Sequence, residues 1–303
     1  MNKTELYQNY LAHLKAAEIF RSDFPEETAE TTLNALWNAV ADISLNTNVE
    51  PSELPDLSEA QKTVLEEFIE KRCNGTPLAY LTGRTRFMGL ELFCEPGVLI
   101  PRAETELLCT TVVTSLSTTN NDSGQLPGID VGCGCGNLSC GIASNNNSVR
   151  IHAIDMTDEC VSLTRKNVAA LQLNDRISVY KGDMFSPLLD AHLEEKVDFI
   201  VSNPPYVPSA KLQSDLTHLI DHEPEAAFNG GIYGFAVHQR LLKDSLMYLK
   251  PGGFLFFEFG AGQDKQVGML CRRIKGYTEA KFINDRQGVP RVAILCKLKG
   301  SAH

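Results

Sequence analysis

Over the first 76 residues, apolar side chains recur every three to four positions, the spacing that places them on one face of an α-helix. In the first two segments these side chains are Leu6, Tyr10, Leu11, Leu14, Leu33, Leu36, Trp37 and Val40. A third segment begins at Ser58, which together with Gln61 matches a capping box at the start of a helix. The pattern predicts a small helical bundle over residues 1–76, with Trp37 in its core.

The pattern changes after residue 76. Residues 86–94 are rich in aromatic and β-favouring side chains around a central glycine, which predicts a hairpin within a linker over residues 77–101. From residue 102 onward, short apolar runs alternate with helical segments. The predicted strands are residues 129–131, 151–154, 177–180, 197–201 and 254–257, and the helices between them include 158–171 and 237–249. This alternation predicts an α/β, Rossmann-like domain over residues 102–303, which ends in a hairpin over 280–295.

Composition limits the classes of function. There are 28 Lys and Arg residues against 38 Asp and Glu, a net charge of −10, which argues against a broad basic face for nucleic acid. No apolar run approaches the about 18–20 residues of a membrane span, and the first residues lack the apolar core of a signal peptide. We therefore expect a soluble, cytoplasmic enzyme.

The nine cysteines do not predict a metal site. Only Cys133, Cys135 and Cys140 lie close together, and the nearest histidine is His152. A zinc site needs paired cysteines at wider spacing or a histidine nearby. Cys133 and Cys135 are more simply small residues that fill a tight turn, and free thiols suit a reducing compartment.

A glycine-rich loop at residues 132–136 follows the first predicted strand and precedes a helix. Its glycines run G-x-G-x-G, which departs from the G-x-G-x-x-G of dinucleotide sites, and the Gly-Lys-Ser/Thr of a phosphate-binding P-loop is absent. Together with Asp130, the pattern suits S-adenosylmethionine, whose amino-acid end is a small zwitterion without phosphate. We expect Asp130, Gly132, Cys133 and Gly134 to contact this cofactor.

Two further carboxylates stand at the ends of the next two strands. Asp155 can accept hydrogen bonds from the ribose hydroxyls, and Asp183, followed by Met184, can accept from the adenine amino group. Each alone would fit a solvated loop acid or a helix cap equally well. Three features at successive strand ends, in this order, favour cofactor binding.

The fourth strand is followed by the tetrapeptide Asn203-Pro-Pro-Tyr206. Pro205 pushes Pro204 towards an extended conformation, which can turn the Pro204 carbonyl outward beside the Asn203 side-chain oxygen. Two acceptors at a fixed separation suit a planar –NH2 group and orient its lone pair towards a methyl donor. The tetrapeptide, with Tyr206 as an aromatic wall, therefore indicates methylation of an amide or exocyclic amino nitrogen.

Other segments extend this pattern: residues 77–83 (Pro-Leu-Ala-Tyr-Leu-Thr-Gly), residues 99–106 (Leu-Ile-Pro-Arg-Ala-Glu-Thr-Glu), Glu223-Pro224, and Gly230-Gly231 with Gly234. With the tetrapeptide they resemble the HemK/PrmC-type methyltransferases, which modify a glutamine of peptide chain release factors. The resemblance covers nearly the whole chain. The tetrapeptide alone also occurs in DNA adenine methyltransferases, whereas residues 99–106 and the helical leader point to the release-factor family.

The resemblance implies a function and its residues. S-adenosylmethionine would be held at Asp130, Gly132, Gly134, Asp155, Asp183 or Met184, and Asn203. The N5 amide nitrogen of the glutamine in a release factor's Gly-Gly-Gln motif would be held and methylated at Asn203, Pro204, Pro205 and Tyr206, with the release factor docked on the helical domain. The sequence departs from the family at Met184, where an aromatic residue is frequent, and at Tyr233, Cys133 and Cys135.

Two rival interpretations remain. A DNA or RNA adenine N6-methyltransferase would carry the same tetrapeptide, but it needs a basic track and a target-recognition domain, neither of which is evident. A non-catalytic cofactor-binding protein would be expected to have lost Asn203 or Tyr206, and both are present.

Overall fold

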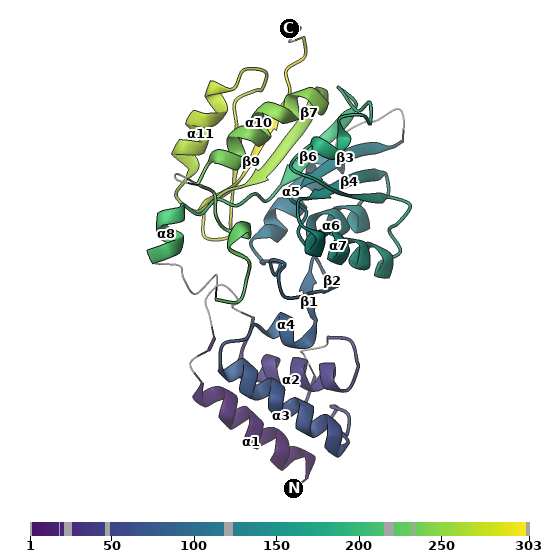
Figure 1. Ribbon diagram of the computed structural model, residues 1–303, viewed down its shortest axis with the longest axis vertical. Helices are drawn as coiled ribbons and strands as arrows, with labels where there is room; N and C mark the ends of the chain where they lie inside the picture. The colour runs from purple at the N-terminus through teal and green to yellow at the C-terminus, as the bar shows by residue number, and fades with distance from the viewer. Residues whose placement is uncertain are drawn as a thin grey trace. The chain divides into compact units, whose positions relative to one another are not determined.

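The computed structural model describes residues 2–17, 19–20, 26–45, 49–117, 124–214, 221–231 and 234–300, without the Gln213 side chain. Tyr233 and all of residues 118–123 and 215–220 therefore lie outside the described residues. The chain divides into two compact units, Met1–Pro96 and Gly97–His303. They are called the helical unit and the sheet unit below (Figure 1).

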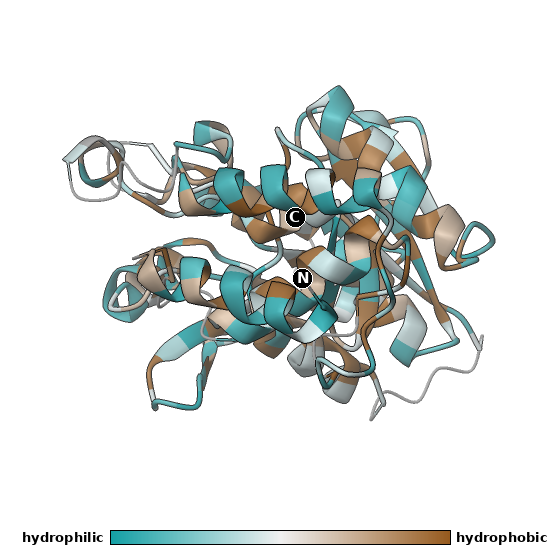
Figure 2. Cartoon of the chain, turned by 90° about the horizontal axis from the view of Figure 1, so that it is seen from below, coloured by the Kyte–Doolittle hydropathy of each residue, from teal (hydrophilic) through white to brown (hydrophobic). Residues whose placement is uncertain are grey.

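The helical unit contains α1 (Lys3–Ala16), α2 (Ala29–Val40), α3 (Glu59–Cys73) and the short α4 (Leu78–Thr82). Asn2, Thr28 and Ser58 cap the first three helices with reciprocal side-chain and backbone hydrogen bonds, as predicted for Ser58. Trp37 is 1% exposed and lies in the apolar cluster of this unit, as predicted. Figure 2 shows apolar and polar stretches alternating along the helices, in agreement with amphipathic packing.

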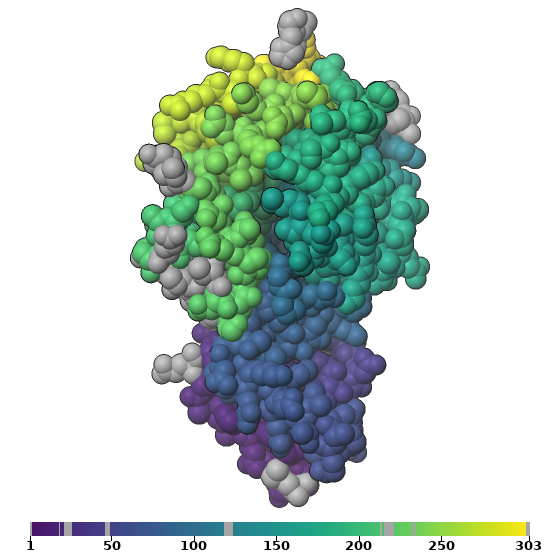
Figure 3. Space-filling model, viewed as in Figure 1, coloured from purple at the N-terminus to yellow at the C-terminus, as the bar shows by residue number. Residues whose placement is uncertain are grey.

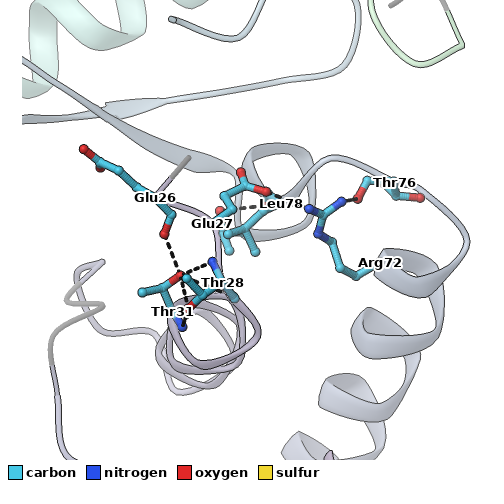
Figure 4. A network of polar contacts seen from close by, with 8 residues as sticks. Glu26, Glu27, Thr28, Thr31, Arg72, Thr76 and Leu78 are labelled. Carbon is cyan, nitrogen blue, oxygen red and sulfur yellow. Dashed lines mark hydrogen bonds and ion pairs between the residues drawn. The ribbon is translucent and has the colours of Figure 1, made fainter. Parts of the chain in front are cut away.

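A buried ion pair joins the start of α2 to the end of α3 (Figure 4). Arg72 is 4% exposed; its Nη2 lies 2.6 Å from Glu27 Oε2 and its Nη1 donates to the Thr76 carbonyl at 3.3 Å. Beside it, the Thr28 N–H donates to Thr31 Oγ1 at 2.8 Å at the N-terminus of α2. The guanidinium thus has a counter-charge and a carbonyl acceptor, which compensates its burial.

The helical unit ends in an antiparallel hairpin of β1 (Arg84–Phe87) and β2 (Leu90–Phe93). Met88 and Gly89 form its two-residue turn, with φ of 51° and 76°. Two successive positive φ values are typical of the type I′ turn, which matches the twist of the strands.

The sheet unit is built on seven strands in the order β5-β4-β3-β6-β7-β9-β8. Its strands are β3 (Leu126–Val131), β4 (Val149–Asp155), β5 (Ile177–Lys181), β6 (Val197–Ser202), β7 (Leu249–Glu258), β8 (Lys281–Asn284) and β9 (Pro290–Cys296). The first five strands in this order pair in parallel, and β9 pairs antiparallel with both β7 and β8. The predicted parallel sheet and final hairpin are confirmed.

Helices connect and cover these strands: α5 (Thr105–Ser117), α6 (Asn137–Asn145), α7 (Asp158–Ala170), α8 (Ser209–Ser214), α10 (Ala236–Tyr248) and α11 (Asp264–Arg273). Two short 3-10 helices, Ser186–Leu188 and Glu225–Ala227, lie in the loops. β7 begins five residues earlier than predicted because Leu249 already pairs with Val197, ahead of a register shift in β6.

The strand order positions the site. The chain runs outward from β3 through β4 to β5, and then returns to place β6 on the other side of β3. Such a reversal opens a crevice at the carboxyl ends of the two adjacent strands, where ligands bind in open α/β sheets. Ser202 Oγ donates to the Val131 carbonyl at 2.7 Å and ties the two strand ends together.

Candidate active site

The glycine loop leaves β3 at this crevice and leads into α6. Gly132, Gly134 and Gly136 have φ values of 73°, 57° and 82°, a region that favours glycine. A Cβ on Gly136 would lie 2.8 Å from Thr164 Cγ2, whereas one on Gly132 or Gly134 would meet nothing within 4 Å. The first two glycines therefore border open space, and a ligand can approach the bare backbone there.

The loop's own hydrogen bonds limit what this ligand can be. The N–H groups of Gly132 and Cys133 both donate to the Ile154 carbonyl at 2.9 Å, and that of Gly134 donates to Asp155 Oδ2 at 2.9 Å. Three successive donors are thus already used within the protein, in contrast to loops that cradle phosphate. The arrangement suits a ligand without phosphate at this point, such as S-adenosylmethionine.

Cys133 takes part in the loop with its backbone. Its side chain is 2% exposed and its Sγ lies 3.5 Å from Thr164 Oγ1, on the protein side of the loop. Burial raises the pKa of the Cys133, Cys135 and Cys140 thiols, so none is activated as a thiolate. The interpretation of Cys133 and Cys135 as space-filling residues agrees with this burial.

Asp130, the penultimate residue of β3, is completely buried under the loop. Its Oδ2 accepts from the Ser139 N–H at 3.1 Å and from the Ser139 hydroxyl at 2.6 Å, at the first turn of α6. Its Oδ1 has no hydrogen-bond partner among the described residues. Burial raises the pKa of Asp130 to about 7, because the hydrogen bonds from Ser139 offset only part of the desolvation. A buried carboxylate with an unused oxygen fits the cationic end of the expected cofactor.

Asp155, the last residue of β4, is 9% exposed and holds the glycine loop in place. Its Oδ2 accepts from the Gly134 N–H, and its Oδ1 accepts from the Thr157 N–H at 3.2 Å. A carboxylate oxygen can accept more than one hydrogen bond, so this role leaves capacity for the ribose hydroxyls.

Asp183 and Met184 follow β5. The Asp183 carboxylate faces α10 and forms a two-pronged ion pair with Arg240, at 2.9 and 3.2 Å. Both side chains are more than half exposed, so the pair contributes little and can yield to a ligand. Met184 is partly buried with φ of 52° and packs against the apolar core of the unit.

The tetrapeptide begins directly after β6, on the other side of the crevice. Asn203 is partly buried, and its Nδ2 donates to Thr105 Oγ1 at 3.1 Å. Thr105 is the first residue of α5 and is 2% exposed. This hydrogen bond commits the amide nitrogen to the protein and leaves the Asn203 side-chain oxygen as an acceptor. Pro204 is buried, and Pro205 and Tyr206 are half-buried.

Tyr206, the last residue of the tetrapeptide, contacts a buried carboxylate. Its hydroxyl donates to Glu258 Oε1 at 3.3 Å, and Glu258, the last residue of β7, is 2% exposed. Burial raises the pKa of Glu258 to about 7, while the Thr105 hydroxyl, the charge of Arg291 and the Tyr206 hydroxyl act against that rise. The Tyr206 hydroxyl has its own pKa raised by burial, so it remains a donor at neutral pH.

Backbone packs closely around the tetrapeptide. A Cβ on Gly230 would lie 2.8 Å from the Pro205 carbonyl oxygen, and one on Gly234 would lie 2.4 Å from that of Tyr206. Gln263 Nε2 donates to the same Tyr206 oxygen at 3.0 Å. The glycines at 230 and 234 thus allow the loop after the tetrapeptide to fold directly against it.

Residues 99–106 are joined to the loop that follows the tetrapeptide. Glu223 is 5% exposed; it accepts from the Ile100 N–H at 3.0 Å and pairs with Arg102 Nη2 at 2.5 Å. Two segments that the sequence marked out separately are therefore joined by one buried carboxylate. Figure 3 shows the surface hollowed between the teal and green parts of this unit.

Sequence reasoning missed Glu258, Thr105 as a partner of Asn203, and Gln263. The signal for Glu258 was available, since it is a charged residue at the end of the apolar run 254–257, as Asp155 is at the end of β4. Its link to Tyr206 spans 52 positions in sequence and only the fold reveals it. All nine cysteines are without disulfides, and within the described ranges no three His, Cys, Asp or Glu side chains are grouped to hold a metal.

Comparison with known proteins agrees with this geometry. The family model described as "Methyltransferase small domain" matches residues 105–243. The structure titled "Crystal structure of hMettl16 catalytic domain in complex with MAT2A 3'UTR hairpin 6" superposes with a TM-score of 0.55 over 81% of this chain and 84% of that one, at 16% identity. This likeness shows a common methyltransferase fold.

Similarity in sequence is more specific. A release factor glutamine methyltransferase of Thermosynechococcus vestitus is 34% identical over 230 residues, which are 76% of this chain and 77% of the relative. One of Clostridium botulinum is 32% identical over 236 residues, covering 78% and 81%. With the fold, the glycine loop and the tetrapeptide in place, this similarity shows that the chain belongs to the release factor glutamine methyltransferase family.

Proposed function

We propose that the protein transfers a methyl group from S-adenosylmethionine to the N5 side-chain nitrogen of the glutamine in the Gly-Gly-Gln motif of a peptide chain release factor. The observation that carries this function is the Asn203–Thr105 hydrogen bond beside the tetrapeptide. It leaves the Asn203 oxygen free to accept from a substrate amide, at the crevice that the glycine loop also borders.

The cofactor supplies an electrophilic methyl group when it is bound. Asp130, Gly132, Gly134, Asp155 and Asp183, with the backbone of Cys133 and the Met184 side chain, are the residues that would hold it. The open space beside Gly132 and Gly134 and the unused Asp130 oxygen support this fit.

The tetrapeptide would orient the nucleophile, which is the amide nitrogen of the substrate glutamine. An amide nitrogen is weakly nucleophilic because its lone pair is delocalised into the carbonyl group. Asn203 Oδ1 and the Pro204 carbonyl would accept its two N–H bonds, while Pro205 and Tyr206 pack the side chain. Held in this way, the nitrogen is oriented for attack and the positive charge that develops on it is stabilised.

The helical unit would dock the release factor. Its residues 1–96 contain eight Lys and Arg against sixteen Asp and Glu, a net charge of −8 of the chain's −10. Such a surface repels nucleic acid and suits a protein partner. Because its substrate is a translation factor, we place the enzyme in the cytoplasm; no helix in the described segments has the length and apolarity to cross a membrane.

The experiment that tests this function offers three substrates with labelled S-adenosylmethionine. They are a release factor, its variant with Gly-Gly-Ala in place of Gly-Gly-Gln, and duplex DNA. Label on the first substrate alone supports the proposal. Label on DNA would instead favour the adenine N6-methyltransferase, and label on the Gly-Gly-Ala variant would show that the acceptor is another residue.

A further inference from the structure

Tyr206 is held by hydrogen bonds at both its side chain and its backbone. Its hydroxyl donates to Glu258 Oε1 at 3.3 Å, and its carbonyl oxygen accepts from Gln263 Nε2 at 3.0 Å. Glu258 is the last residue of β7, and Gln263 directly precedes α11. One short segment of the chain therefore holds both the ring and the main chain of the residue that packs the substrate side chain in the proposed function.

The Gln263 side chain has a single orientation that satisfies its neighbours. Its Oε1 accepts from the Gly260 N–H at 2.8 Å, while its Nε2 donates to the Tyr206 carbonyl. A backbone N–H can only donate, and a backbone carbonyl can only accept. The amide therefore places its oxygen towards Gly260 and its nitrogen towards Tyr206, and it bridges the turn after β7 to the tetrapeptide.

The turn after β7 also packs closely against Tyr206. A Cβ on Gly260 would lie 3.1 Å from Tyr206 Cδ2, a ring atom, and 2.8 Å from Gln263 Oε1. A Cβ on Gly234 would lie 3.2 Å from Gln263 Nε2. The amide bridge is thus packed against two backbone segments, which limits the movement of the Tyr206 ring that it supports.

The side chain of Gln263 does not serve its own helix. Gln263 is the N-cap residue of α11, and its side chain makes no capping hydrogen bond. Glutamine is also not among the residues favoured at an N-cap, such as serine, threonine, aspartate and asparagine. The local structure of α11 therefore does not explain a glutamine at position 263, whereas its hydrogen bond to Tyr206, 57 positions away in the chain, does.

We propose that Gln263 is a positioning residue for methyl transfer, and that its amide bridge fixes the Tyr206 ring where this ring packs the glutamine side chain of the release factor. The role rests on the proposed function, because Tyr206 packs that side chain only if a glutamine is the methyl acceptor. Gln263 acts through Tyr206 and not on the reacting atoms. A displaced ring would let the acceptor nitrogen turn away from the methyl donor, which lowers the rate of transfer more than the affinity for the release factor.

Two variants separate the two hydrogen bonds of the bridge. At alkaline pH, Gln263→Glu keeps the side-chain length and an oxygen that can accept from Gly260, but it cannot donate to the Tyr206 carbonyl. Gln263→Met has a side chain of similar length and removes both hydrogen bonds. The matched control is Gln266→Glu, because Gln266 is exposed on α11 and the substitution introduces the same charge.

The first arm of the test needs no substrate. Tyr206 and Val207 form the only Tyr-Val pair in the sequence, so 13C in the tyrosine carbonyls and 15N in the valines isolate the Tyr206 carbonyl signal by NMR. A carbonyl carbon resonates further downfield when its oxygen accepts a hydrogen bond. We expect an upfield shift in Gln263→Glu and Gln263→Met, and none in Gln266→Glu. An unchanged signal in both Gln263 variants would overturn the bridge, whatever the substrate is.

The second arm measures methyl transfer to the release factor and the Kd of S-adenosylmethionine. We expect both Gln263 variants to lower kcat about 10- to 100-fold, with KM for the release factor and the cofactor Kd within about twofold, and Gln266→Glu to keep full activity. Rescue of the rate by Gln263→Glu would show that only the hydrogen bond to Gly260 matters, and would overturn the positioning role.

Full activity in both Gln263 variants would overturn the role as well, and so would a loss of cofactor binding that parallels the loss of rate, because it would indicate a general effect on the fold of the unit. If the unmodified protein methylates no release factor, the proposed function fails, and the carbonyl signal still decides whether the bridge exists.

Discussion

In the helical unit the buried Arg72 guanidinium lies 2.6 Å from the Glu27 carboxylate, whereas in the sheet unit the buried Glu258 carboxylate lies 3.9 Å from the Arg291 guanidinium. Asp130 is likewise buried, with two hydrogen bonds from Ser139 on one oxygen and none on the other. In the helical unit the buried guanidinium is thus paired with a carboxylate. The sheet unit keeps two carboxylates with pKa values raised to about 7, a departure typical of functional sites.

The largest effect on stability is expected in the helical unit. Replacing Arg72→Met leaves the Glu27 carboxylate beside an apolar side chain, and breaking a buried pair from one side typically costs about 3–5 kcal/mol. Chemical denaturation should show this loss, while the double variant Arg72→Met/Glu27→Gln should recover part of it. A loss below about 1 kcal/mol would show that the pair is not stabilising this unit.

The largest effect on catalysis is expected at Asn203. Asn203→Ala removes an acceptor that acts on the transition state, and turnover should fall roughly 100- to 1000-fold. The Kd of S-adenosylmethionine should stay within about threefold, because the glycine loop is unchanged. Steady-state kinetics measure the turnover, and calorimetry measures the Kd. Retained full activity would exclude the orienting role of Asn203.

Replacing Glu258 should change the free energy of unfolding in the opposite direction to replacing Arg72. The pKa of Glu258 is higher in the folded protein than its ordinary value, so protonation stabilises the fold, and this contribution is lost as the pH rises through about 7. Glu258→Gln stays neutral and should be more stable than the unmodified protein at pH 8, by up to roughly 3 kcal/mol, but not at pH 4. Urea unfolding at both pH values tests this. Equal differences at the two values would mean that Glu258 does not titrate in this range.

A smaller effect concerns the cofactor. Asp130 must be ionised to attract a cationic ligand end, so binding of S-adenosylmethionine should strengthen up to about tenfold per pH unit between pH 5.5 and 7. Asp130→Asn should bind more weakly and lose this dependence. Calorimetry over that interval makes the comparison, and an unchanged slope in the variant would place the titration at another group.

The smallest effect is expected from surface charge on the helical unit. Glu67 and Glu70 are exposed on α3, and Glu67→Lys/Glu70→Lys should raise KM for the release factor a few-fold at low salt, less at high salt. The control Glu194→Lys/Glu279→Lys changes the charge by the same amount at exposed positions of the sheet unit. Equal effects of the two double variants would contradict docking on the helical unit.

Sequence patterns predict the features that depend on nearby residues in the chain, such as the ends of the strands. The predicted strand ends at Val131, Ile154 and Val201 lie within one residue of the observed ends, because polar residues bound the apolar runs. The parallel order then brings Asp130, Asp155 and Asn203 to one edge. Contacts between distant segments were not predictable in this way. Thr105 meets Asn203 across 98 positions, and Asp183 pairs with Arg240 across 57, because the sheet order and not the sequence spacing sets these distances.

The most direct test of the central claim is to locate the transferred methyl group. A release factor is incubated with the protein and S-adenosylmethionine, and the Gly-Gly-Gln peptide is examined by fragmentation mass spectrometry. One added methyl on the side-chain nitrogen of that glutamine, absent when Asn203→Ala replaces the unmodified protein, is the expected result. A methyl on any other residue, or the same yield from Asn203→Ala, would contradict the account.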